Sequence, residues 1–185
     1  IQQQGWRGLC IHFRNCGGTN NRLDRHYHIG DTGDIMNVLS IIRNREPNVQ
    51  LTAVGYSLGG NVLLKWLGEM GKRCPLKAAV AVSVPFKLAI ASELASNGLS
   101  RMYEKYFVDI MKKSLINKFK NRPYPPVDLQ KMEECSTFIE FDEYITAPLH
   151  GFNGSAEYYQ KSSSCFYLKG ISKPTLIVQA LDDPL

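Results

Sequence analysis

The sequence has few cysteines, and their spacing follows no known pattern. The five residues are odd in number and widely separated, with no Cys-x-x-Cys pair or Cys/His cluster: Cys10, Cys16, Cys74, Cys135 and Cys165. A disulfide framework needs paired cysteines and a structural zinc site needs closely spaced ligands, so the spacing argues against both. Reduced thiols fit a cytoplasmic protein, which is the compartment that we expect.

Signals for export, membrane insertion and nucleic-acid binding are also lacking. Residues Ile1 to Gly5 contain no initiator methionine, no basic region and no apolar run, so neither a signal peptide nor a membrane span is visible. The formal net charge is +5, and much of the local excess comes from Lys112, Lys113, Lys118, Lys120 and Arg122. No aromatic stacking platform or base-reading motif accompanies these residues. We interpret them as the solvated face of a helix and predict no nucleic-acid partner.

The same basic segment leaves one interaction open. Apolar and aromatic residues recur in it at helical spacing: Tyr103, Tyr106, Phe107, Ile110, Met111, Leu115 and Phe119. Such a stripe is commonly plain core, but an amphipathic helix of this kind can also lie on a lipid surface. A peripheral membrane contact through this segment is therefore one of the expected interactions.

The chain is organised around a serine between two glycines. An apolar run from Leu51 to Val54 leads into Gly55-Tyr56-Ser57-Leu58-Gly59, and an apolar helical pattern follows at once. A strand, a sharp turn and a helix in this order expose a nucleophilic serine. We expect side chains at Gly55 and Gly59 to collide with the neighbouring strand and helix. Ser57 is the predicted nucleophile, with an ordinary glycine-rich turn as the alternative.

The residues around such a serine have predictable roles. At the N-terminal end of the following helix, the backbone N–H of Leu58 and the positive helix end can face an oxyanion. A carboxylate is expected just beyond a later buried strand, where it can orient an imidazole. The apolar run Pro174 to Gln179 is followed by Asp182 and Asp183, and the spacing favours Asp183 over Asp182 for this role.

Strand-like and helical patterns alternate along the chain. The segments Arg7 to Phe13, Lys77 to Val84 and Pro174 to Gln179 read as buried strands, and Asp31 to Arg43 carries the signals of a helix. This alternation predicts an α/β fold with a mostly parallel sheet and helices on its faces. We expect Arg7 to Phe13 to form a central strand that buries His12 in the core.

Two further stretches have a predicted place near the serine. The polar connection from Arg14 to Gly30 should lie at the same sheet edge as Ser57. Its basic residues fit an anionic substrate group and ion pairs with neighbouring loops equally well: Arg14, Arg22, Arg25, His26 and His28. Residues 86–140 read as a helical insertion, in the position of a lid, and His150 is expected to be structural.

Several of these motifs together resemble one family. The chain is similar to the α/β hydrolases of the YheT type, the AB hydrolase 4 family, which is related to the ABHD1 and ABHD3 lipases. The resemblance rests on His12-Phe13-Arg14-Asn15-Cys16-Gly17-Gly18, Arg25-His26-Tyr27-His28, Gly55-Tyr56-Ser57-Leu58-Gly59-Gly60-Asn61, Glu140-Phe141-Asp142, Tyr158-Tyr159 and Asp182-Asp183-Pro184.

The resemblance implies an α/β-hydrolase fold with a helical lid, and an esterase or lipase that acts through an acyl-enzyme. Ser57 matches the family's nucleophile and Asp183 its charge-relay acid. The substrate would be a small-molecule ester or a lipid, and no cofactor or metal is implied. The resemblance also places a strand carrying a second oxyanion donor before Ile1 and the catalytic histidine after Leu185. Residues 1–185 would then form a partial domain that is inactive and poorly folded alone.

Other functions use the same residues. An acyltransferase would form the same acyl-enzyme on Ser57 and transfer the acyl group to an alcohol, and a peptidase would attack an amide. A non-catalytic binding protein would keep the fold without the chemistry. The sequence does not choose the acyl chain length, the head group or the oligomeric state.

Overall fold

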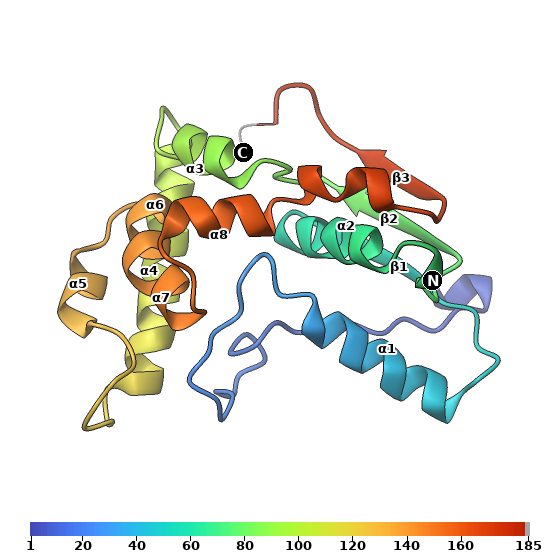
Figure 1. The fold of residues 1–185 in the computed structure, drawn as a ribbon, viewed down its shortest axis with the longest axis horizontal. Coiled ribbons are helices and arrows are strands. Elements are labelled where there is room, and N and C mark those ends of the chain that lie inside the picture. The colour runs from blue at the N-terminus through green and yellow to red at the C-terminus, as the bar shows by residue number, and fades with distance from the viewer. Residues whose placement is uncertain (184–185) are drawn as a thin grey trace.

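The computed structural model describes residues 1–183, and a parallel sheet lies at its centre. The three strands are β1 (Thr52–Tyr56), β2 (Ala78–Val82) and β3 (Thr175–Val178), in the spatial order β1-β2-β3 (Figure 1). Each corresponds to a predicted strand. The connection from β1 through a helix to β2 is the βαβ unit on which the site is built, because parallel strands need such a crossover.

Helices occupy most of the chain outside the sheet. Before and after β1 lie α1 (Gly33–Arg45) and α2 (Leu58–Met70). Between β2 and β3 lie α3 (Leu88–Ala95), α4 (Ser100–Phe119), α5 (Leu129–Glu134), α6 (Phe138–Phe141), the π-helix η3 (Asp142–Thr146), α7 (Ala147–Leu149) and α8 (Ser155–Ser162). Short 3-10 turns are η1 (Gln2–Gln4), η2 (Gly71–Arg73), η4 (Ser164–Phe166) and η5 (Leu168–Gly170).

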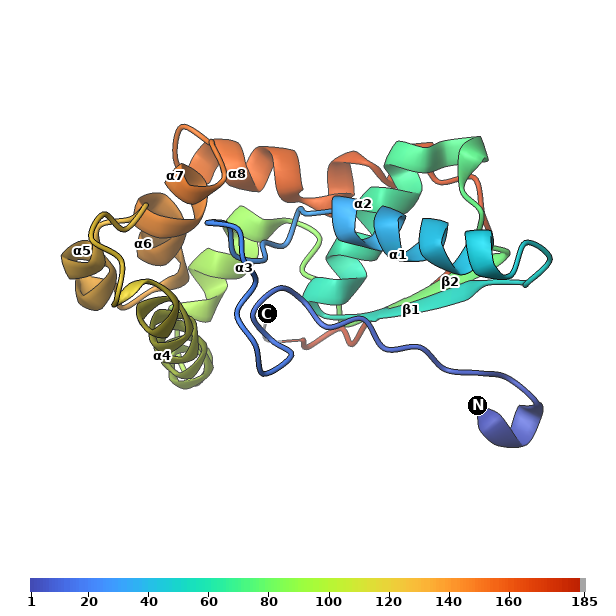
Figure 2. The same ribbon diagram turned by 90° about the horizontal axis from the view of Figure 1, so that it is seen from below.

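The main core lies between α2 and the sheet. Leu63, Leu64 and Leu67 of α2 are almost fully buried, and Ala79 and Ala81 of β2 belong to the same cluster. Each buried leucine contributes about 1.5–3 kcal/mol relative to an exposed one. The small alanines allow α2 to approach the sheet closely. In Figure 2, α1 and α2 lie on the same side of the sheet.

One glycine shows how tight the packing around α2 is. A Cβ added at Gly68 would lie 2.2 Å from the carbonyl oxygen of Tyr167, so the helix contacts the segment before β3 backbone to backbone. A carbonyl oxygen of the main chain cannot move aside as a flexible side chain can. Gly68 therefore fixes the distance between α2 and the η4–η5 segment.

The other face of the sheet is apolar as well. The register aligns Val54, Val80 and Leu176 across the three strands, and Tyr56 with Val82 and Val178 in the next row. Val54 is 55% exposed, Tyr56 68% and Leu176 60% in the part of the chain that the structure describes.

The predicted strand at Arg7 to Phe13 is not formed. This segment has no regular secondary structure, and His12, expected in the core, is exposed. A strand needs a neighbour for its backbone hydrogen bonds. Leu9 and Ile11 of the segment line a cavity together with Ala53 and Val54 of β1. In the described chain the segment forms no ladder with β1, and Figure 2 shows it running past the strand.

The helical region between β2 and β3 forms a second core. Val108, Leu115 and Phe119 of α4 pack with Met132 of α5 and with Phe141, among other residues. The helices α3 to α6 fall within the predicted insertion at residues 86–140, to within one residue. Its action as a lid stays a prediction. Within residues 1–183, no helix combines the length and the apolar character required to cross a membrane.

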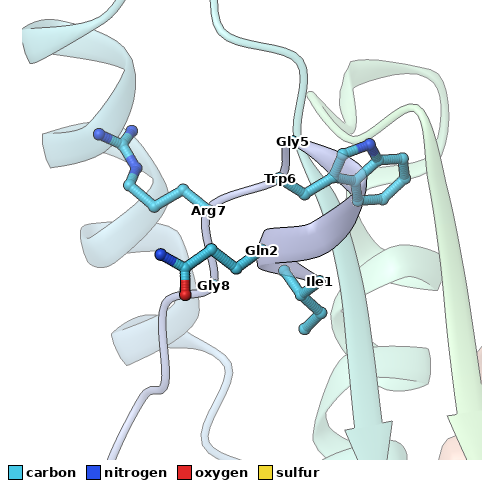
Figure 3. Close-up of a pocket in the computed structure, with 6 residues that line it drawn as sticks. All are labelled: Ile1, Gln2, Gly5, Trp6, Arg7 and Gly8. Carbon is cyan, nitrogen blue, oxygen red and sulfur yellow. The ribbon is translucent and has the colours of Figure 1, made fainter.

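A shallow depression at the N-terminus lies apart from the serine. Figure 3 shows its six lining residues, with the side chains of Trp6 and Arg7 on opposite sides of the segment. Ile1 and Trp6 are exposed, and Arg7 forms an ion pair with Glu46 at 2.7 Å. The depression contains no nucleophile or acid and is not a candidate site.

Candidate active site

Ser57 lies at the bend between β1 and α2, as the sequence predicts. Its backbone has φ 48° and ψ −118°, a conformation that residues other than glycine rarely adopt. The residue is exposed. Its N–H donates to the carbonyl oxygen of Val82 at 2.8 Å, and its own carbonyl accepts from the N–H of Asn61 at 3.1 Å. These two bonds hold the strained residue between the neighbouring strand and the helix.

The two glycines of the motif differ in their roles. A Cβ added at Gly55 would lie 2.5 Å from the carbonyl oxygen of Gly59, so the turn closes only with glycine at this position. At Gly59 a Cβ would have no neighbouring atom within 4 Å, so the collision predicted there is wrong. The second position that excludes a side chain is Gly60, where a Cβ would lie 2.6 Å from Cγ2 of Val84.

Leu58 is the first residue of α2. The N–H groups in the first turn of a helix have no partner within the helix, and the helix dipole adds positive potential there. This environment suits the stabilisation of an anion next to Ser57. It agrees with the predicted position of an oxyanion donor, whose role stays a prediction.

Asn61 fixes the helix that carries Ser57, and sequence reasoning gave it no role. Its side chain is fully buried. The amide Nδ2 donates to the carbonyl oxygens of Ile29 (3.1 Å) and Ser162 (2.8 Å), and Oδ1 accepts the N–H of Ser164 (2.9 Å). Loss of either half of this amide would leave buried backbone groups unpaired. The only signal in the sequence was its place at the end of the serine motif.

A large cavity opens beside Ser57. Its volume is about 850 Å³, and Ser57 and Leu58 belong to its lining. Apolar side chains from the region between β2 and β3 line it as well: Leu88, Phe107, Ile110, Met111 and Phe138. Cavities of this size and character bind small molecules with an apolar part. Residues of the predicted lid and the predicted nucleophile therefore line the same space.

Asp183 follows β3, and its side chain is partly exposed. Oδ2 accepts a hydrogen bond from Nε2 of Gln179 at 3.0 Å, while Oε1 of Gln179 accepts the N–H of Val84 at 2.7 Å. The carboxyl ends of β1 and β3 are at one edge of the sheet, about 10 Å apart at two strand spacings. Asp183 does not belong to the lining of the cavity. Pro184, from the same motif, lies outside the described residues.

Three of the four histidines are buried or half-buried: His26, His28 and His150. The rings of His28 and His150 are 4.4 Å apart, and Nδ1 of His28 accepts the N–H of Gly30 at 3.2 Å. Burial lowers the pKa of His26 and of His28 to about 4 and that of His150 to about 3. These rings are neutral near pH 7. His150 is half-buried against His28, and its structural role stays a prediction.

The basic residues of the Arg14 to Gly30 connection are largely paired within the protein. Arg14 contacts Asp34 at 2.5 Å, and Arg25 contacts Asp31 at 2.5 Å. The sequence left two roles open for these residues, an anionic substrate group and ion pairs with neighbouring loops. For Arg14 and Arg25 the structure contains the ion pairs. In the part of the chain that the structure describes, no three His, Cys, Asp or Glu residues are grouped to hold a metal ion.

Comparison with known proteins agrees with the α/β fold. The profile of the family described as alpha/beta hydrolase fold matches residues 1–185. The protein named "Putative esterase YheT" of Escherichia coli K12 is 39% identical over 184 residues, which is 99% of this chain and 54% of that protein. Human "Phospholipase ABHD3" is 28% identical over 182 residues, 98% of this chain and 44% of that protein.

A third relative is named for a different activity. "Monoacylglycerol lipase ABHD2" of Danio rerio is 30% identical over 196 residues, covering all of this chain and 46% of that protein. The chain thus spans about half the length of the curated relatives that it matches. No solved structure matches it.

The strain at Ser57 can be tested by stability alone. We expect Ser57→Gly to be about 1 kcal/mol more stable than Ser57→Ala in the full-length protein, because glycine adopts a positive φ without penalty and alanine does not. Urea denaturation of both variants measures the difference. If the alanine variant is equally or more stable, the backbone at residue 57 is not strained in solution.

Proposed function

The chain belongs to the alpha/beta hydrolase fold family, and from this premise we propose that it is the nucleophile-bearing part of a serine hydrolase that cleaves carboxylic esters. The observation that carries the proposal is the position of Ser57. An exposed serine with a positive φ, between a strand of the parallel sheet and a helix N-terminus, opens onto a mostly apolar cavity.

In the proposed reaction, Ser57 Oγ attacks the ester carbonyl and forms an acyl-enzyme. The N–H of Leu58 and the N-terminal end of α2 stabilise the oxyanion. A histidine takes the proton of Ser57 and passes it to the leaving alcohol, and water then releases the acid. Asp183 orients that histidine and stabilises its protonated form. We propose that this histidine comes from the part of the relatives' length that the chain does not span, beyond Leu185.

The cavity supports an acyl chain as the substrate's apolar part. Phe107, Ile110 and Met111 of α4 present apolar surface to it, and its volume of about 850 Å³ is enough for a chain of several carbons. The relatives are named putative esterase, phospholipase and monoacylglycerol lipase. These names agree with ester hydrolysis and differ in the substrate, so the proposal stops at carboxylic esters with an apolar acyl group.

Contact with a lipid surface is a further part of the proposal. Large apolar side chains of α3 and α4 are exposed in the described chain, including Leu94, Met102, Tyr103 and Tyr106. Basic residues accompany them on α4, among them Lys105 and Lys113. Exposed aromatic residues flanked by lysines are typical of helices that lie on anionic membranes. A lipid substrate could enter the cavity from that surface.

The nucleophile can be identified by covalent labelling. In the full-length protein we expect a fluorophosphonate probe to label the wild type and not Ser57→Ala. Ser83→Ala is the matched control, because Ser83 is also exposed, also has a positive φ (51°) and follows the adjacent strand β2. Labelling that persists in Ser57→Ala, or that disappears in Ser83→Ala alone, would contradict the assignment.

The two adjacent aspartates give a second test. Asp183→Asn should lower kcat for a short-chain ester by about 10⁴-fold, because the histidine would lose its orienting carboxylate. Asp182→Asn should change kcat little, since we assign this residue to the turn. Steady-state kinetics on the two full-length variants compares them directly. A large loss in Asp182→Asn with little loss in Asp183→Asn would exchange their roles.

Lipid contact is tested by flotation with vesicles of mixed phosphatidylcholine and phosphatidylserine. Met102→Ser combined with Tyr106→Ser should reduce the fraction of full-length protein that floats by about tenfold, because two apolar anchors are lost. Tyr124→Ser is the control, since Tyr124 is 92% exposed but lies outside α3 and α4. Equal flotation of both variants would exclude this surface.

A further inference from the structure

One wall of the Ser57 cavity is polar, and the reaction proposed above does not use it. Asp142, Thr146 and Ser92 line the cavity together with the apolar residues already described. Ser92 lies on α3, and Asp142 and Thr146 lie on η3. The helices α4, α5 and α6 separate these two elements in the sequence. The fold therefore adds a group of hydrogen-bonding side chains to a mostly apolar space.

Asp142 is the charged member of this group. Its Oδ2 accepts a hydrogen bond from the hydroxyl of Tyr159 at 2.9 Å, and its carboxyl also accepts one from the Thr146 side chain. Tyr159 is in turn linked to Ser92 through its hydroxyl. A carboxylate has about four acceptor positions. Two hydroxyl donors leave acceptor capacity unused.

The surroundings of Asp142 disfavour its charged form. Its pKa is raised to about 6 because of burial. Among the ion pairs of residues 1–183, none includes Asp142. A buried carboxylate without a cation is stable only if donors compensate for lost water. The residue as a whole is half-buried and lines the cavity, which is the side from which a donor of the substrate would approach.

The local backbone is unusual as well. Residues Asp142 to Thr146 form a π-helix, a rare conformation that occurs often at functional sites. The side chains of Asp142 and Thr146, four residues apart, both line the cavity.

We propose that Asp142 determines specificity by accepting a hydrogen bond from a donor group of the substrate, either a hydroxyl or an ammonium, while the apolar wall holds the acyl chain. This inference rests on the proposed ester hydrolysis and adds the polar part of the substrate to it. Asp142 takes no part in bond breaking. Esters with a free hydroxyl on their alcohol portion bind better than esters with the same skeleton and no donor.

The experiment measures binding without turnover. Full-length protein carrying Ser57→Ala is titrated by calorimetry with hexyl glycerol ether and with its derivative in which both hydroxyls are methylated, which keeps the oxygen acceptors and removes the donors. We expect the free diol to bind about tenfold more tightly, as suits a hydrogen bond to a charged acceptor. A third ligand, hexylamine, replaces the hydroxyl donors with an ammonium.

Asp142→Asn in the same background should reduce the preference for the diol to about twofold or less. An amide has one acceptor oxygen, and the hydroxyls of Tyr159 and Thr146 compete with the ligand for it. Asp109→Asn is the matched control, since Asp109 lies on α4 outside the cavity lining, and it should keep the tenfold preference. Preference for hexylamine over the diol would identify an ammonium as the donor, and the reverse a hydroxyl.

Three results would overturn the inference: no preference in the parent, an unchanged preference in Asp142→Asn, or no binding of any of the three ligands. If Asp142→Asn does not fold, Tyr159→Phe replaces it. That variant keeps the carboxylate and frees an acceptor position, so the preference should persist or rise, and its loss would be contrary evidence. Fluorophosphonate labelling of the wild type tests the hydrolase separately, so the two ideas can fail independently.

Discussion

The backbone at Ser57 is the constraint on which the rest of the site depends. A positive φ at a serine costs about 1–3 kcal/mol, and that energy must come from surrounding contacts. The bond from Ser57 N–H to Val82 links the turn to β2, and the buried leucines of α2 hold the helix against the sheet. The absence of a side chain at Gly55 lets the strand and helix meet. The exposed hydroxyl is thus maintained by the core behind it.

Asn61 extends this constraint to segments far away in the sequence. Its three hydrogen bonds join α2 to Ile29, in the connection before α1, and to Ser162 and Ser164, after the helical insertion. Tyr158 adds a fourth link, because its hydroxyl accepts the N–H of Ile29 at 3.1 Å. Motifs separated by more than a hundred residues therefore meet behind the serine. A change in the helical insertion can reach Ser57 through α8 and this amide.

Patterns of neighbouring residues in the sequence predicted those elements that form from neighbouring residues alone. The apolar runs at β1, β2 and β3 and the turn at Ser57 carry their own signals, so the α/β class and the position of the serine followed from the sequence. The segment Arg7 to Phe13 reads equally well as a strand, but pairing depends on which backbone lies beside it, and in the described chain the segment forms no ladder with β1. Asn61 and Asp142 were visible only as parts of motifs, since their partners come from distant segments.

The buried histidines are poorly suited to the role of the base in the proposed mechanism. A general base is most effective when its pKa is near the working pH. Burial holds the pKa of His26, His28 and His150 at about 3 to 4, so each would be a weak base at neutral pH. Their neutral form suits packing, since a charged pair at the contact between His28 and His150 would repel. In the proposed mechanism, the base for Ser57 is an imidazole that stays in contact with water and with a carboxylate, which is the environment expected at the carboxyl edge of the sheet, where Asp183 lies.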